Sequence, residues 1–240
     1  MRSRVADGQF RVGQITEAVA DLDRTHRRLL ERGWSHDDAV AFQADGLVQA
    51  RDRRRDPVRA AEVRWKVADP ARIRPPFTIP VTGGLVAYPV RDGLDRTERL
   101  TGQQILDGGG LAALFERTRA ATLAEPVHPG PMRWERFTGP TLRGDVYTAS
   151  RLIDLDAVLD LVQIKAGPAI VAAPTHQDLW FCAVPPQVDW REVAWAVTAA
   201  GARRIEEVGD ILFDGAWRLE PDRRLVRVAA RQDGEIIILT

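Results

Sequence analysis

The spacing of apolar residues changes at about residue 60 of this 240-residue chain. Over residues 14–51 apolar side chains mostly recur three or four positions apart, the period of an amphipathic helix, and Ser35 with Asp38 resembles a capping box that starts a second helix. Over residues 63–67 apolar and charged residues alternate, which is the period of a half-buried strand. This order predicts an α+β fold: an N-terminal helical hairpin followed by a mixed, mainly antiparallel sheet packed with helices.

Prolines mark a domain boundary near residue 70. The connection after the first strand contains four prolines, which make it stiff and non-helical: Pro70, Pro75, Pro76 and Pro80. We therefore expect residues 1–70 to hold the helical hairpin and the first strand. Residues 71–240 should form an α+β domain, since 45% hydrophobic and 28% charged residues are typical of a packed globular protein.

The second region contains signals for both helices and strands. The glycines at 108–110 interrupt a helical pattern that follows Thr101, so two short helices are expected there. Four prolines and three glycines between residues 125 and 144 predict a long surface connection. Asp145 should then cap one helix that reaches Val162. The remaining predicted elements are a strand at 85–90, a β-hairpin at 169–184, a helix from 188 that ends at Gly201, and strands at 211–219, 225–230 and 235–239.

Composition and motif searches argue against several function classes. The formal charge is zero, with 34 basic and 34 acidic residues, so no overall field draws the chain to nucleic acid or membrane. The arginine run at 51–55 fits a solvated helix end better than a nucleic-acid contact. Cys182 is the only cysteine, which excludes an intramolecular disulfide and a four-thiolate metal site and fits a reducing cytoplasm. No apolar run is long enough to span a membrane, and no phosphate-loop, dinucleotide or paired-histidine motif indicates a cofactor or a metal.

Two groups of polar residues are candidates for a site. The turn at 175–178 lies between apolar strands and would hold its side chains rigidly, although turns also collect such residues for backbone hydrogen bonding. Acidic residues follow the 85–90 strand and precede the helix that starts at Asp145, where a solvated outer face explains them equally well. The catalytic candidates are Asp145, Tyr147, His176 and Asp178. The binding candidates are Asp92, Asp95, Ser150, Thr175 and Trp180.

Four segments of the second region follow one another in a characteristic order: 85–95, 100–123, 144–152 and 169–181. In this order of segments the chain from about residue 85 to residue 240 resembles the YtpQ-like family of bacterial proteins of unknown function. The family commonly has arginine before the turn aspartate, where this chain has Gln177. The resemblance therefore implies a fold and its boundary rather than an activity.

Two functions remain as hypotheses. The seven tryptophans and the lack of a complete catalytic motif favour a non-enzymatic binding or adaptor protein, of the immunity-like or accessory kind. Its partner would be another protein, and a homo-oligomer stays open. The alternative is an enzyme of undefined class whose Asp, Tyr and His residues come from separate segments. The arginine-rich and alanine-rich composition suggests a bacterial source.

Overall fold

The computed structural model describes residues 26–27, 29–31, 35–41, 58–73, 75–92, 97–164 and 168–239. The chain divides into two compact units, Met1–Asp56 and Pro57–Thr240. Most of the predicted helical hairpin at 14–51 lies outside the described residues. Within them, residues 36–41 are helical, and the backbone N–H of Asp38 donates to the Ser35 hydroxyl at 3.1 Å, as predicted for a capping residue.

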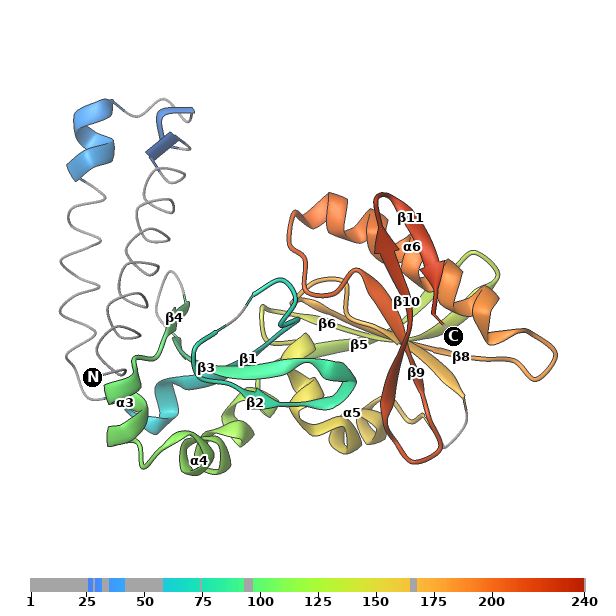
Figure 1. The fold of residues 1–240 in the computed structure, drawn as a ribbon, viewed down its shortest axis with the longest axis horizontal. Helices are drawn as coiled ribbons and strands as arrows, with labels where there is room; N and C mark the ends of the chain where they lie inside the picture. The colour runs from blue at the N-terminus through green and yellow to red at the C-terminus, as the bar shows by residue number, and fades with distance from the viewer. Residues whose placement is uncertain are drawn as a thin grey trace, which may run out of the picture. The chain divides into compact units, whose positions relative to one another are not determined.

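A small antiparallel sheet opens the second unit (Figure 1). Its strands are β1 (Val63–Ala68), β2 (Ile79–Pro80), β3 (Val86–Asp92) and β4 (Thr97–Arg99), with β1 and β2 on either side of β3 and β4 also paired with β3. The predicted alternation in β1 is confirmed, because Val63, Trp65 and Val67 are fully buried. The predicted boundary near residue 70 placed the first strand with the N-terminal region. In the structure β1 hydrogen-bonds along its whole length to β3, and both strands belong to the second unit.

A seven-stranded sheet with all neighbours antiparallel forms the larger part of this unit. Its order is β11-β10-β9-β7-β8-β6-β5. The predicted hairpin and the three C-terminal strands are confirmed. The strands are β5 (Val127–Trp134), β6 (Phe137–Gly144), β7 (Ala169–Ala172), β8 (Asp178–Ala183), β9 (Gly215–Leu219), β10 (Leu225–Gln232) and β11 (Glu235–Ile238).

The β5–β6 hairpin corrects the prediction of a long surface connection at 125–144. Pro129 and Pro131 are tolerated because β5 is an edge strand, so its outer side needs no N–H donors. Gly139 lies in the neighbouring strand, β6, at a position where β8 leaves no room for a side chain. A Cβ there would lie 1.9 Å from the carbonyl oxygen of Phe181. Proline and glycine therefore marked a sheet edge and a close strand contact rather than a loop.

The helices agree with the predictions in part. The two short helices are confirmed as α3 (Gly102–Asp107) and α4 (Leu111–Leu123). The prediction of a single helix starting at Asp145 is wrong, because a 3-10 helix, η3 (Ala149–Asp154), leads into a short α-helix, α5 (Leu155–Leu161). Asp154 separates them, since its carboxylate accepts the N–H of Ala157 and caps α5. Two further 3-10 turns are η1 (Ala60–Glu62) and η2 (Thr82–Gly84).

The last helix, α6 (Trp190–Val208), is longer than predicted. It continues through Gly201, which is buried and lies beside Pro174 and Trp180. The helix ends instead at Gly209, which has a left-handed φ of 72°. Our predicted end at Gly201 is therefore wrong.

The seven-stranded sheet has a separate core on each face. On one face α6 covers the first core, which includes Trp134, Ile170, Trp180 and Val197. The second core joins the sheet to β1, β3, α4, η3 and α5. Figure 1 shows α6 (orange) on the side of the large sheet away from α5 (yellow). No helix among the described residues has both the length and the apolar content needed to cross a membrane.

Candidate functional site

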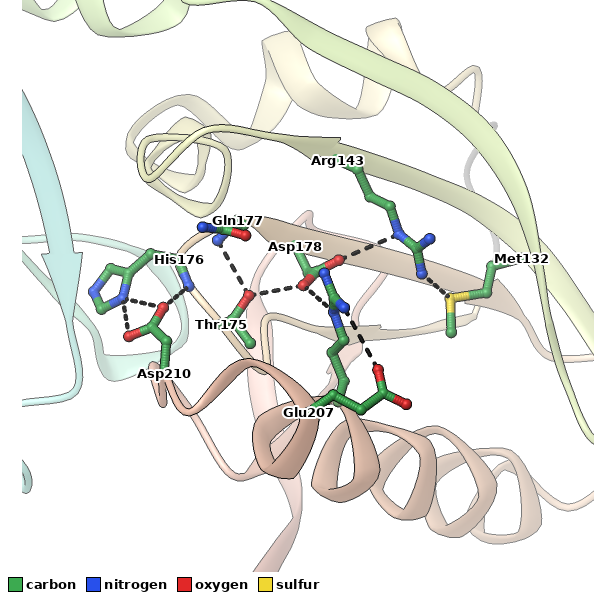
Figure 2. Close-up of polar contacts among 9 residues, drawn as sticks. Met132, Arg143, Thr175, His176, Gln177, Asp178, Glu207 and Asp210 are labelled. Carbon is green, nitrogen blue, oxygen red and sulfur yellow. Dashed lines mark hydrogen bonds and ion pairs between the residues drawn. The ribbon is translucent and has the colours of Figure 1, made fainter. Parts of the chain in front are cut away.

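The turn at 175–178 joins β7 to β8, and its aspartate is bound internally. Asp178 is fully buried, and its carboxylate accepts hydrogen bonds from the Thr175 hydroxyl at 2.7 Å and from Nε of Arg204 at 2.8 Å. Nε of Arg143 lies 3.3 Å from the other carboxylate oxygen. Figure 2 shows Asp178 between β6, which carries Arg143, and α6 below it. Asp178 and Thr175 therefore tie the start of β8 to both neighbours and are not available to a ligand.

Two other predicted binding residues also lie in the interior. Ser150 is fully buried, and its hydroxyl accepts the backbone N–H of Val67 at 3.3 Å. Trp180 is fully buried against Trp134 in the core under α6. Both support packing rather than a surface contact. Asp95, also predicted, lies outside the described residues.

The remaining four predicted residues lie on adjoining segments. Backbone hydrogen bonds join the 144–149 segment to the turn, because the N–H of Ala149 donates to the carbonyl of His176 at 3.0 Å. The Tyr147 hydroxyl donates to Asp92 at 3.0 Å, and the Tyr147 N–H donates to Asp145 at 2.8 Å. The structure therefore brings Asp92, Asp145, Tyr147 and His176 together from β3, the segment after β6, and the β7–β8 turn.

His176 is held by an aspartate that the sequence did not indicate. Nδ1 of His176 lies 2.9 and 3.0 Å from the two carboxylate oxygens of Asp210, and the His176 backbone N–H donates to the same group at 2.9 Å (Figure 2). Burial alone would raise the pKa of Asp210, but the hydrogen bonds and charge of His176 outweigh it, so the pKa falls. Nε2 of His176 is buried and has no hydrogen-bond partner among the described residues.

Lys66 lies beside these groups on the polar face of β1. It stands opposite Tyr88 in the β1–β3 ladder, is half-buried, and its ammonium lies 6.0 Å from the centre of the Tyr147 ring. Burial lowers the pKa of Lys66, and the charges of Asp210, Asp92 and Asp145 offset part of this effect. Within the described part of the chain, no hydrogen bond or ion pair reaches the ammonium. We call this group the Lys66 cluster: Lys66, Asp92, Asp145, Tyr147, His176 and Asp210.

Desolvation dominates the electrostatics of the cluster. Burial is the main cause of the raised pKa of Asp145, with Glu125 and Asp92 adding to it. Burial and the hydrogen bond to Asp92 raise the pKa of Tyr147. Burial likewise raises the pKa of Tyr88. Burial therefore favours the neutral forms of Lys66, Asp145 and Tyr147, whereas Asp210 is kept charged by His176, so a charged group of a ligand would meet weakly hydrated partners.

Cavities and metal geometry give no further site at these residues. The two best-defined hollows of the described part, of about 400 and 380 Å³, are lined by other residues. No group of His, Cys, Asp or Glu among the described residues could hold a metal ion. Cys182 is buried beneath α6, and burial raises the pKa of its thiol to about 11. These observations make the cluster a surface feature rather than an enclosed chamber.

Sequence reasoning missed Lys66 and Asp210. A signal for Lys66 existed, because it is one of only two lysines among 34 basic residues and lies on the charged phase of the β1 alternation. Asp210 follows the true end of α6, so its position became visible only once that end was known.

Comparison with known proteins adds no relative. No family model matches the chain, and the searches of curated proteins and of solved structures found no match. The resemblance to the YtpQ-like family therefore stays a prediction. Function has to be argued from the residues themselves.

Proposed function

We propose that this chain is a non-enzymatic binding protein whose Lys66 cluster contacts an acidic segment of another protein. The observation that carries the proposal is the half-buried ammonium of Lys66, which has no ion-pair partner among the described residues. Taking a charge partly out of water costs free energy unless a counter-charge compensates it, and the charges of Asp210, Asp92 and Asp145 offset only part of that cost for Lys66. A carboxylate presented by a partner would supply that counter-charge.

The surroundings of Lys66 suit a protein segment. Asp92 and Asp145 raise the pKa of Lys66 without touching it. Each carboxylate accepts a hydrogen bond from Tyr147 through Oδ1, which leaves its Oδ2 for a hydrogen-bond donor of a ligand. An extended segment offers both kinds of group, an acidic side chain for Lys66 and backbone N–H groups for the aspartates. Small-molecule sites are usually concave, whereas the best-defined hollows of the described residues lie elsewhere.

Binding is favoured over turnover by the state of the reactive groups. The thiol of Cys182 is buried and its pKa is raised to about 11, so it is not an activated nucleophile. Nε2 of His176, the atom that a general base would use, is buried. The hydroxyl of Tyr147 already donates to Asp92.

An enzyme remains the second candidate because one arrangement favours it. A carboxylate that holds Nδ1 of a histidine orients the ring for proton transfer at Nε2, and Asp210 does this for His176. Tyr147 and two further carboxylates lie on the adjoining segments. This reading requires a movement that exposes Nε2 to a substrate.

The proposal is tested by co-purification with three tagged forms of the full chain. The baits are the wild type, Lys66→Met, and Lys165→Met as a control that removes the only other lysine. All three are expressed in a bacterial cytoplasm, where we place the protein as an immunity-like or accessory component. A lost charge-assisted contact is worth roughly 1.5–3 kcal/mol, so the Lys66 variant should bind its partner about 10-fold to 100-fold more weakly.

The outcomes separate the alternatives. A partner that is recovered with the wild type and with Lys165→Met but lost with Lys66→Met supports the proposal. Equal recovery with all three baits contradicts it, as does a monodisperse wild type that recovers no protein. Urea unfolding of each bait checks that a lost partner does not reflect a lost fold.

A further inference from the structure

The two edges of the seven-stranded sheet differ in how they are protected. The β5 edge contains Pro129 and Pro131, which have no N–H to donate to another strand, and Gly130, which weakens a strand. The β11 edge contains three consecutive isoleucines, Ile236–Ile238, and no proline or lysine. In the described part of the chain β11 is paired with β10 alone. Unprotected apolar edges of this kind are templates for strand addition.

The register of the β10–β11 hairpin shows which backbone groups remain free. Gln232 faces Glu235 across a two-residue turn, and the N–H of Leu239 donates to the carbonyl of Val228 at 2.9 Å. Odd-numbered residues of β11 therefore direct their backbone groups toward β10. Ile236 and Ile238 direct theirs away from it, and the side chain of Ile237 is 39% exposed.

We propose that β11 pairs with β11 of a second copy of this chain, antiparallel and across a two-fold axis at Ile237. In this register Ile236 of one copy faces Ile238 of the other, and these two pairs exchange four backbone hydrogen bonds. The two Ile237 side chains meet on the axis. The pairing joins the two large sheets into one continuous sheet.

Complementarity favours a second copy over an unrelated strand. A ladder between two β11 strands forms only in registers that pair Ile236 and Ile238, whose backbone groups point away from β10, with each other or with themselves. Among these registers, the one centred on Ile237 places isoleucine opposite isoleucine at all three central positions. The one charged residue of β11, Glu235, then faces Leu239 of the other copy, so no like charges oppose each other. The contact is small, so we expect a dissociation constant on the order of 10 µM.

Sedimentation equilibrium of the full chain tests the dimer. The wild type should be mainly monomeric at about 1 µM and mainly dimeric at about 200 µM, and Ile237→Lys should remain monomeric because a charge lies on the axis. Val226→Lys is the matched control, since Val226 is also 39% exposed but lies on the inner strand β10. It should dimerise like the wild type.

Cysteine cross-linking tests the register. Facing residues on the axis have Cα atoms about 4.5 Å apart, so Ile237→Cys should form an intermolecular disulfide on oxidation. Glu235→Cys should not, because the two copies of residue 235 would be about 13 Å apart. Cys182 is buried and does not compete.

Three results would overturn the inference. The first is a wild-type protein that does not self-associate at any concentration. This result includes the case in which β11 binds a strand of another protein instead of a second copy. The second is a dimer that Ile237→Lys leaves intact. The third is cross-linking through Glu235→Cys and not through Ile237→Cys.

Discussion

Replacing Asp178 with alanine removes the carboxylate that binds Thr175, Arg204 and Arg143 at the junction of β8, α6 and β6. Breaking a buried ion pair from one side typically costs about 3–5 kcal/mol, because the remaining charge loses its partner. The side chains of Arg204 and Arg143 are 27% and 50% exposed, so water can partly replace the carboxylate. We therefore expect the lower end of the range, about 3 kcal/mol.

Urea unfolding measures this loss as a change in midpoint at constant slope. Asp178→Asn keeps the shape and one acceptor oxygen, so it should lie between alanine and the wild type. Asp222→Ala is the control, since Asp222 pairs with Arg224 at the surface and its loss should matter far less. If Asp178→Ala unfolds within about 1 kcal/mol of the wild type, the junction does not stabilise the fold and Asp178 returns as a site candidate.

Two further predictions concern buried groups. The pKa of Lys66 should lie below 10.5, and Asp210→Asn should lower this pKa further because the charge of Asp210 favours the ammonium. Carbon-13 NMR of methylated lysines measures the pKa of Lys66 in the wild type and in the variant. A higher pKa of Lys66 in the variant would contradict the assigned geometry. The thiol of Cys182, with its pKa raised to about 11, should react with a disulfide reagent at pH 8 only after unfolding. Rapid labelling of the native protein would show that the packing around this strand is wrong.

Local patterns predicted much of the sheet. The alternation at 63–67 and the Asp233-Gly234 turn required no knowledge of distant residues, and both lie in strands or turns as expected. The β5–β6 hairpin was missed because Pro129 and Pro131 are compatible with a strand only when its outer side is unpaired. That condition depends on the whole sheet.

The site was predictable only in part for a similar reason. Asp145, Tyr147 and His176 were noticed because polar residues beside apolar segments are visible in the sequence. Their proximity depends on the hydrogen bonds between the 144–149 segment and the turn, which no local pattern encodes. The same holds for Asp178, whose role is set by Arg204 on α6.

Lysine footprinting on the partner complex tests the Lys66 proposal most directly. An amine-acylating reagent modifies neutral lysines, so Lys66, with its lowered pKa, should react readily in the free protein. A partner carboxylate would both cover Lys66 and favour its charged form, so its acylation rate should fall on complex formation, with Lys165 as the internal reference. An unchanged acylation rate of Lys66 in a fully formed complex would show that the partner binds elsewhere.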